Sequence, residues 1–236
     1  MKLEYLYPEL GNLFGDSANM RYLRQCLPDA DYVETPLGAT PAFLTDETVS
    51  FVYSGPMTER GQRLALSHLA PLAADFQRRV EAGVHFLFTG NSLELLGKRI
   101  DTAEGPLEGL GLVDLTARQA LMQRYNGLFL GQVEDIQITA FNSRFSHAAP
   151  GPSVTGFAQV TRGVGLEPGC GFEGVRLGNL VGTYLLGPLL VMNPLLTQRL
   201  LRSLGAGDVR PAFYDQAMAA YEKRLAEFSD PRRKLD

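Results

Sequence analysis

The chain has 236 residues, of which 45% are hydrophobic and 20% are charged, and its net charge is −4. These totals predict a single globular domain over residues 1–236 with a substantial buried core. The acidic balance excludes general nucleic-acid binding, because the only basic run is Arg232-Arg233-Lys234. With no signal peptide and no apolar run long enough to enter a membrane, the expected location is the cytoplasm.

The cysteines and histidines point away from metal chemistry. Cys26 and Cys170 make no disulfide framework, and Cys26 is expected in the core, where a free thiol packs as a small hydrophobe. The three histidines, His68, His85 and His147, have no metal-type spacing. No metal and no cofactor are therefore predicted.

In the first half, predicted strands alternate with predicted helices. Helices are expected from about residue 17 to 27 and over 62–79, where Pro71 must kink or split the second. The strands are expected at residues 3–6, 32–34, 49–53 and 84–88. Strands joined through helices favour right-handed crossovers, so the prediction is an α/β fold with a mostly parallel, doubly wound sheet.

The second half changes character. Strands are predicted with little helix between them at residues 127–131, 133–141, 154–162, 172–176 and 179–185. Two helices are predicted to end the chain, over 194–204 and 211–228.

The run VHFLFTGNSLELLG at residues 84–97 organises the rest. A buried strand, a tight turn and the start of a helix are the arrangement of a nucleophile elbow, in which the tip residue is exposed beside a helix N-terminus. The residue at the tip is Gly90, which has no nucleophilic atom. We expect Gly90 to have a positive φ, and Ser92 to cap the helix by accepting hydrogen bonds from the next N–H groups.

Three further segments carry a family resemblance. They are LYPELGNLFGD at 6–16, GLGLVD at 109–114, and GTYLLGPLL at 182–190 with Asn193-Pro194 after it. Together they resemble class I glutamine amidotransferases of the cobyric acid synthase type, and in particular the branch of the lipid II isoglutaminyl synthase glutaminase subunit. The resemblance implies a flavodoxin-like three-layer sandwich. It also implies a Mur-ligase-like or other amide-forming synthetase as partner, in peptidoglycan or cobalamin biosynthesis.

The same resemblance shows four departures from the family pattern. The positions of the catalytic Cys and His fall on Gly90 and Leu186, which we expect to face each other. The Gly-rich oxyanion loop is replaced around Gly55 and Pro56, with Asn91 after the elbow tip, and proline removes an N–H donor from a place where donors hold an oxyanion. The run 144–147 replaces an Asn-His-x-Gly-Arg-Thr motif. These departures predict loss of glutaminase activity and a remaining role as a non-catalytic partner or ligand-binding subunit.

An alternative keeps chemistry at the same place. Ser92, Cys170 or His147 would then be recruited to a different substrate, although Cys170 also fits a small residue in a glycine-rich turn and His147 is expected on the surface. Glu94 and Arg99 read as an ion pair on a helix face. The residues named as possible ligand-binding groups are Ser92, Glu94, Arg124 and Arg144, with Arg124 a candidate for an anion. The run 189–192 is either an apolar rim for a partner or a buried connection.

Overall fold

The computed structural model describes residues 1–235. Its central sheet contains five parallel strands in the order β2-β1-β3-β4-β13, which is the flavodoxin-like order with β13 as the fifth strand. These strands are β1 (Lys2–Leu6), β2 (Asp31–Thr35), β3 (Val49–Ser54), β4 (His85–Thr89) and β13 (Leu180–Thr183). The predicted α/β fold is confirmed.

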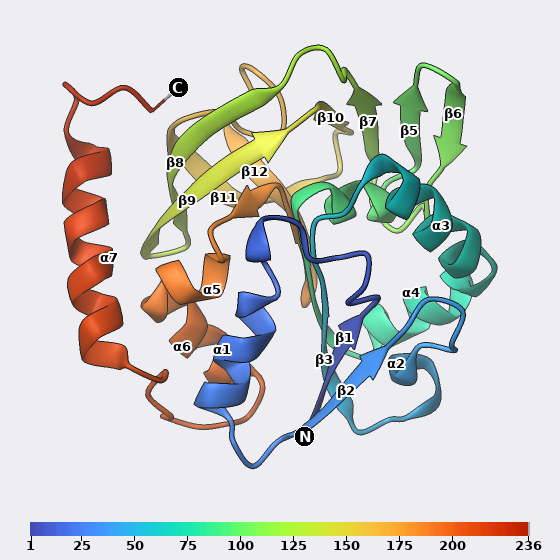
Figure 1. Ribbon diagram of the computed structural model, residues 1–236, viewed down its shortest axis with the longest axis horizontal. Coiled ribbons are helices and arrows are strands. Elements are labelled where there is room, and N and C mark those ends of the chain that lie inside the picture. Colours follow the sequence, from blue (N-terminus) through green and yellow to red (C-terminus); the bar gives the residue numbers. More distant parts are fainter. Residues whose placement is uncertain (236) are drawn as a thin grey trace.

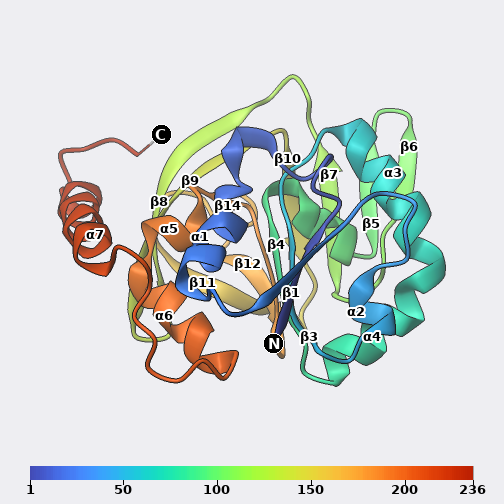
Figure 2. The ribbon, with the colours of Figure 1, turned by 60° about the horizontal axis from the view of Figure 1, so that its bottom comes forward.

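Helices cover both faces of the parallel strands (Figure 2). One face carries α1 (Ala18–Cys26), α5 (Leu189–Met192) and α6 (Pro194–Ser203), and the other carries α2 (Ala42–Thr45), α3 (Glu59–Leu69) and α4 (Ala73–Glu81). The alternation of β4 divides its side chains between two cores: Phe86 and Phe88 pack toward α4, and Leu87 packs toward α5 and α6. Pro71 splits the predicted long helix, because the 3-10 turn η2 (Ala70–Leu72) separates α3 from α4.

The sheet continues as an antiparallel half in the order β12-β11-β8-β9-β14. The strands are β8 (Tyr125–Val133), β9 (Ile136–Arg144), β11 (Thr155–Arg162), β12 (Phe172–Leu177) and β14 (Leu185–Leu186). The last helix, α7 (Tyr214–Ser229), lies along β8 and β9 at one side of the molecule (Figure 1). Tyr221 holds it there by donating to the Gln137 carbonyl at 2.7 Å.

A second sheet, which the sequence did not predict, has the order β10-β7-β5-β6. It consists of β5 (Arg99–Thr102), β6 (Gly105–Glu108), β7 (Leu115–Gln119) and β10 (Ser146–Pro150). The 3-10 segment η3 (Gly90–Leu96) connects β4 to this sheet, and the Leu95 and Leu96 carbonyls accept from the N–H groups of Leu110 and Val113. The segment after the elbow is therefore fixed by both sheets.

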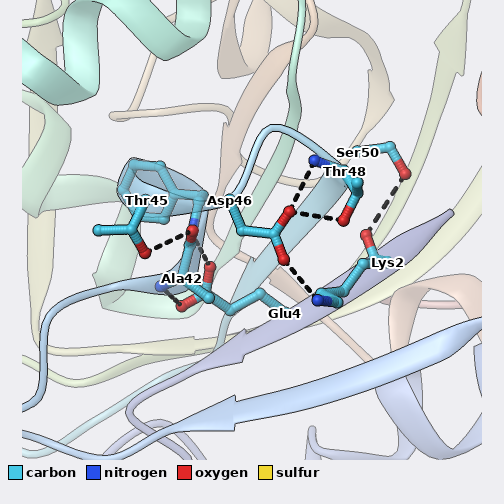
Figure 3. A network of polar contacts seen from close by, with 8 residues as sticks. Lys2, Glu4, Ala42, Thr45, Asp46, Thr48 and Ser50 are labelled. Carbon is cyan, nitrogen blue, oxygen red and sulfur yellow. Dashed lines mark hydrogen bonds and ion pairs between the residues drawn. The ribbon is translucent and has the colours of Figure 1, made fainter.

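A polar network fixes α2 near the starts of β1 and β3 (Figure 3). Because β3 and β4 are parallel, this network lies at the end of the strands opposite to the elbow, which follows β4. The fully buried Glu4 carboxylate accepts from the N–H groups of Ala42 and Phe43, at 2.8 and 2.7 Å, and so caps α2. Asp46, just after α2, pairs with Lys2 and accepts from the Thr48 N–H at 2.8 Å. Within residues 1–235, no helix has the length and apolar character needed to cross a bilayer.

Candidate functional site

The turn after β4 has the geometry of an elbow without a side chain at its tip. Gly90 has a φ of +60°, as predicted, and begins η3 at the carboxyl end of the parallel strands. In sheets of this type, ligands bind at that edge. The following segment is a 3-10 helix rather than the expected α-helix.

The space above Gly90 is filled. A Cβ atom on Gly90 would lie 2.5 Å from the Cβ of Pro56 and 3.3 Å from Cδ2 of Leu186, so a side chain there would meet both residues. Leu186 lies on β14, is 1% exposed, and faces the turn as expected. Pro56 and Leu186 therefore both border the space that a side chain on Gly90 would need.

The loop after β3 is joined to the first loop of the chain by close backbone contacts. A Cβ on Gly55 would lie 2.2 Å from the carbonyl oxygen of Gly11, so only glycine permits this approach. The Leu13 N–H donates to the Pro56 carbonyl at 3.0 Å. The Pro56 position has no N–H to offer an oxyanion.

Asn91 forms a hydrogen bond with the N–H group of Met57, the next residue of the same loop. Its Oδ1 accepts from the Met57 N–H at 2.9 Å, and its Nδ2 donates to the Met57 carbonyl at 2.8 Å. The Met57 N–H is therefore already bonded within the protein, and Asn91 acts as a clamp between the two loops.

The hydroxyl of Ser92 makes different hydrogen bonds from those predicted. Its hydroxyl is fully buried, and its one proton is shared between the carbonyls of Thr89 at 2.7 Å and Ser54 at 3.0 Å. The expectation that Ser92 accepts from N–H groups as an N-cap is wrong, because Thr89 occupies the cap position.

Glu94 does not form the predicted ion pair with Arg99. It is 1% exposed and accepts from Gln62 Nε2 at 2.9 Å, from the Tyr184 hydroxyl at 3.0 Å and from Ser146. Burial raises the pKa of Glu94. Arg99 pairs with Asp101 at the surface instead, because η3 turns Glu94 inward between the two sheets.

A buried polar group beside the elbow was not singled out from the sequence. The Asp16 carboxylate accepts from the Tyr53 hydroxyl at 2.6 Å and from Thr89 Oγ1 at 2.5 Å. Burial raises the pKa of Asp16, which is 1% exposed. The sequence indicates Asp16 only as a possible cap, with Ser17, of the helix expected from about residue 17. In the structure its carboxylate bonds to Tyr53 and Thr89 beside the elbow instead.

A pocket of about 250 Å³ opens next to the elbow. Its wall comes from the first loop, the β3–α3 loop, the start of α3, the elbow, the end of β7 and the segment around β9 and β10. The lining residues are Leu13, Phe14, Pro56, Met57, Thr58, Glu59, Gln62, Asn91, Gln119, Ser143, Arg144, Phe145 and Ser146.

The two predicted ligand-binding arginines, Arg144 and Arg124, lie in different environments. Arg144 is 4% exposed and belongs to the pocket wall, and burial lowers its pKa. Arg124 is exposed and donates to Ser143 Oγ at 2.8 Å, with its guanidinium 5.5 Å from the ring centre of Phe145. Arg144 therefore belongs to the pocket wall, whereas Arg124 lies outside it and contacts the wall residues Ser143 and Phe145.

The remaining candidates for changed chemistry are not assembled. His147 is half-buried rather than exposed, because β10 carries it into the second sheet, and burial lowers its pKa. Cys170 lies half-buried in a loop before β12, and Cys26 is buried in the core as predicted. Within residues 1–235, no hydrogen bond joins Ser92, His147 and Cys170 to one another, and no group of three or more His, Cys, Asp or Glu side chains is placed to hold a metal ion.

Comparison with known proteins relates the chain to glutamine amidotransferases. No protein-family model matches it. Over 195 residues it is 28% identical to the GatD subunit of lipid II isoglutaminyl synthase (glutamine-hydrolyzing) from Staphylococcus aureus (strain N315), covering 80% of this chain and 78% of that protein.

Solved structures agree on the fold. A glutamine amidotransferase matches with a TM-score of 0.56 and 16% identity, covering 86% of this chain and 98% of that chain. A glutamine amidotransferase from Thermotoga maritima matches with a TM-score of 0.50 and 11% identity, covering 97% and 94%. The chain has a glutamine amidotransferase-like fold and is related to GatD.

Proposed function

We propose that this protein is a glutamine amidotransferase-like subunit that does not hydrolyse glutamine and that acts as a non-catalytic partner of an amide-forming, Mur-ligase-like synthetase. The observation that supports it is the filled elbow, where Gly90 faces Pro56 and Leu186. Covalent hydrolysis of the glutamine amide needs a nucleophile at the first position and a proton carrier at the last. Neither glycine nor leucine supplies a reactive atom.

The neighbouring donors support the same conclusion. Pro56 has no N–H, and the Met57 N–H is held by Asn91 at 2.9 Å, so this loop offers fewer free donors to a developing oxyanion. Ser92 is the nearest alternative nucleophile after the tip, but its hydroxyl is fully buried and is used by two carbonyls. The alternative of changed chemistry through Ser92, Cys170 or His147 gains no support from these contacts.

The partner role is inferred from the relative and from the surface. GatD is by name one subunit of a synthase. Around the pocket, Phe14 is 55% exposed and Leu13 38%, and the turn that carries Leu121 and Met122, 51% and 97% exposed, is joined to the pocket residue Phe145 through the Ala120 N–H. Exposed apolar groups clustered at a pocket mark an interaction surface.

The run 189–192 is a weaker candidate for the docking surface than the mouth of the pocket. Leu189 and Leu190 are 0% and 2% exposed and belong to the core on the α5 and α6 face, so they form a buried connection. We propose the pocket mouth as the docking rim instead. We also propose that residues 1–236 form one domain and that the protein works in the cytoplasm. Its two cysteines, Cys26 and Cys170, form no disulfide, which suits a reducing compartment.

Two measurements test the proposal. Glutamate release from glutamine should be absent for the purified chain alone and in its isolated complex, and turnover near about 1 s⁻¹, an ordinary enzyme rate, would overturn it. Cross-linking in native lysate should retain a synthetase subunit, and the Leu121→Asp/Met122→Asp variant should lose it. Leu64→Asp, at a 39% exposed leucine on α3, is the matched control that should keep it.

A further inference from the structure

A second cavity, of about 150 Å³, lies between the sheet and α6, toward the amino end of the parallel strands. Its lining includes His85, the first residue of β4, and Asn179, which directly precedes β13. The elbow follows the last residue of β4, so the cavity lies toward the opposite end of these strands. It shares no lining residue with the pocket beside the elbow and is therefore a separate site.

The interior of the cavity is apolar. The alternation of side chains along β3 and β4 places Phe51 and Leu87 on the face that α5 and α6 cover. The lining residues that belong to this core, none of them more than 9% exposed, are Phe51, Leu87, Phe157, Leu189, Leu190 and Leu196. A cavity of this volume with a leucine and phenylalanine lining disfavours water and admits a molecule the size of benzene.

The charged groups that border the cavity are paired with one another. The Glu134 carboxylate, in the turn between β8 and β9, bonds to Arg176 of β12 at 2.8 Å and to Arg199 of α6 at 2.7 Å. Arg199 also pairs with Asp135. These ion pairs link three elements of the wall and leave no unpaired cation or anion among the described residues that line it. A charged ligand would lose its hydration there without gaining a partner.

His85 is the remaining titratable residue of the lining. Its ring is half-buried, and burial lowers its pKa, so it is neutral at pH 7. The histidine therefore adds a polar group to the border of the cavity but no charge that would attract an ion.

We propose that this cavity binds a small neutral molecule built on a single apolar ring, of the size of a monosubstituted benzene. The ring contacts the leucine and phenylalanine side chains of the core and binds through burial of its apolar surface. The inference is independent of the proposed loss of glutaminase activity, because the elbow contributes no residue to the cavity.

Calorimetric titration of the whole chain with two matched probes tests the inference. Toluene is neutral, whereas benzoate carries the same ring with a carboxylate in place of the methyl group. Toluene should bind with a Kd below about 1 mM. Benzoate should bind at least about 10-fold more weakly, because its charge finds no free partner at the border.

Methyl NMR of the same chain locates the bound probe. The methyl resonances of Leu190 and Leu196, which line the cavity, should shift on addition of toluene. Those of Leu66 and Leu93, which are buried in the core on the other face of the sheet, should not shift.

Variants assign the binding to this cavity. Leu200→Phe adds volume at a half-buried lining position of α6 and should weaken toluene binding at least about 10-fold. Leu195→Phe makes the same change at a half-buried position of the same helix outside the lining, so it should leave the binding unchanged. Val181→Phe fills the cavity from β13 and keeps the test decisive when Leu200→Phe does not fold.

Four results would overturn the inference. They are no binding of toluene up to its solubility limit, equal affinity for toluene and benzoate, methyl shifts confined to leucines outside the lining, and equal weakening by Leu195→Phe and Leu200→Phe.

Discussion

Pro56 occupies the space that any side chain on Gly90 would need, because a Cβ at position 90 would lie 2.5 Å from the Cβ of Pro56. Contacts that short do not occur between real side chains, so one backbone segment would have to move. The loop that carries Pro56 is held by the Leu13–Pro56 hydrogen bond at 3.0 Å and by the Asn91 clamp on Met57. The closed elbow is therefore a property of the two loops together.

Gly90→Ala should lower the free energy of unfolding by about 2–4 kcal/mol, from the positive φ and from overpacking against Pro56. Gly15→Ala is the matched control, since Gly15 has a φ of +70° but nothing within 4 Å of an added Cβ. It should cost only about 1 kcal/mol. Urea unfolding measures both, and equal costs would show that the Pro56 contact relaxes freely.

Placing a cysteine at position 90 and a histidine at position 186 should not by itself produce glutamine hydrolysis. The Gly90→Cys/Leu186→His variant should release no more glutamate than the parent, because the added side chain at position 90 meets Pro56. Adding Pro56→Gly removes the Cβ that blocks it and should raise glutamate release above that of the double variant. A double variant as active as the triple would contradict the steric explanation.

Glu94→Gln should destabilise the protein by about 1–3 kcal/mol, since one acceptor oxygen becomes a donor among the Gln62, Ser146 and Tyr184 donors. Arg99→Ala should change stability by no more than about 0.5 kcal/mol. The double variant should show the sum within about 0.5 kcal/mol. A larger coupling free energy in this double-mutant cycle would show that Glu94 and Arg99 interact, as the sequence predicted.

Glu173 should make the protein less stable as the pH rises from about 4.5 to 7. Burial raises the pKa of Glu173 to about 7, from 4.5 in the unfolded chain. Between these values the folded state holds the proton that the unfolded state releases, so the free energy of unfolding falls with pH, by about 3 kcal/mol in total.

Glu173→Gln should remove this dependence. In urea unfolding, the free energy of unfolding of the Glu173→Gln variant relative to that of the parent should rise from pH 4.5 to 7. The Glu108→Gln variant, changed at an exposed position, should follow the curve of the parent. A constant difference between the Glu173→Gln variant and the parent at all pH values would show that the pKa of Glu173 is the same in the folded and the unfolded chain.

The predicted elements that are confirmed are those with strong local signals. The apolar run 84–88, the split at Pro71 and the final helices all depend on periodicity or on a residue with one strong preference. The second sheet was missed because β5 and β6 have four residues each and few buried side chains.

In the site too, local features could be predicted from the sequence and features that depend on distant segments could not. The positive φ of Gly90 could be predicted from the turn sequence, because it is a local property. The roles of Glu94 and Ser92 could not, since the direction of η3 is set by its packing between two sheets that are distant in sequence. Nothing near Pro56 in the sequence indicates that its ring would lie over Gly90, 34 positions later in the chain.

The contact between Pro56 and Gly90 also limits which residues can stand together at these two positions. A chain with a side chain at position 90 would not accommodate Pro56 without moving its loop, whereas a chain with glycine there accommodates it as this one does. A single substitution that introduces a side chain at position 90 would meet the proline, and a side chain larger than glycine at 90 would not tolerate Pro56 in its present place. The residues at positions 56 and 90 are therefore coupled, and a variant with a side chain at 90 would need a change at 56 as well.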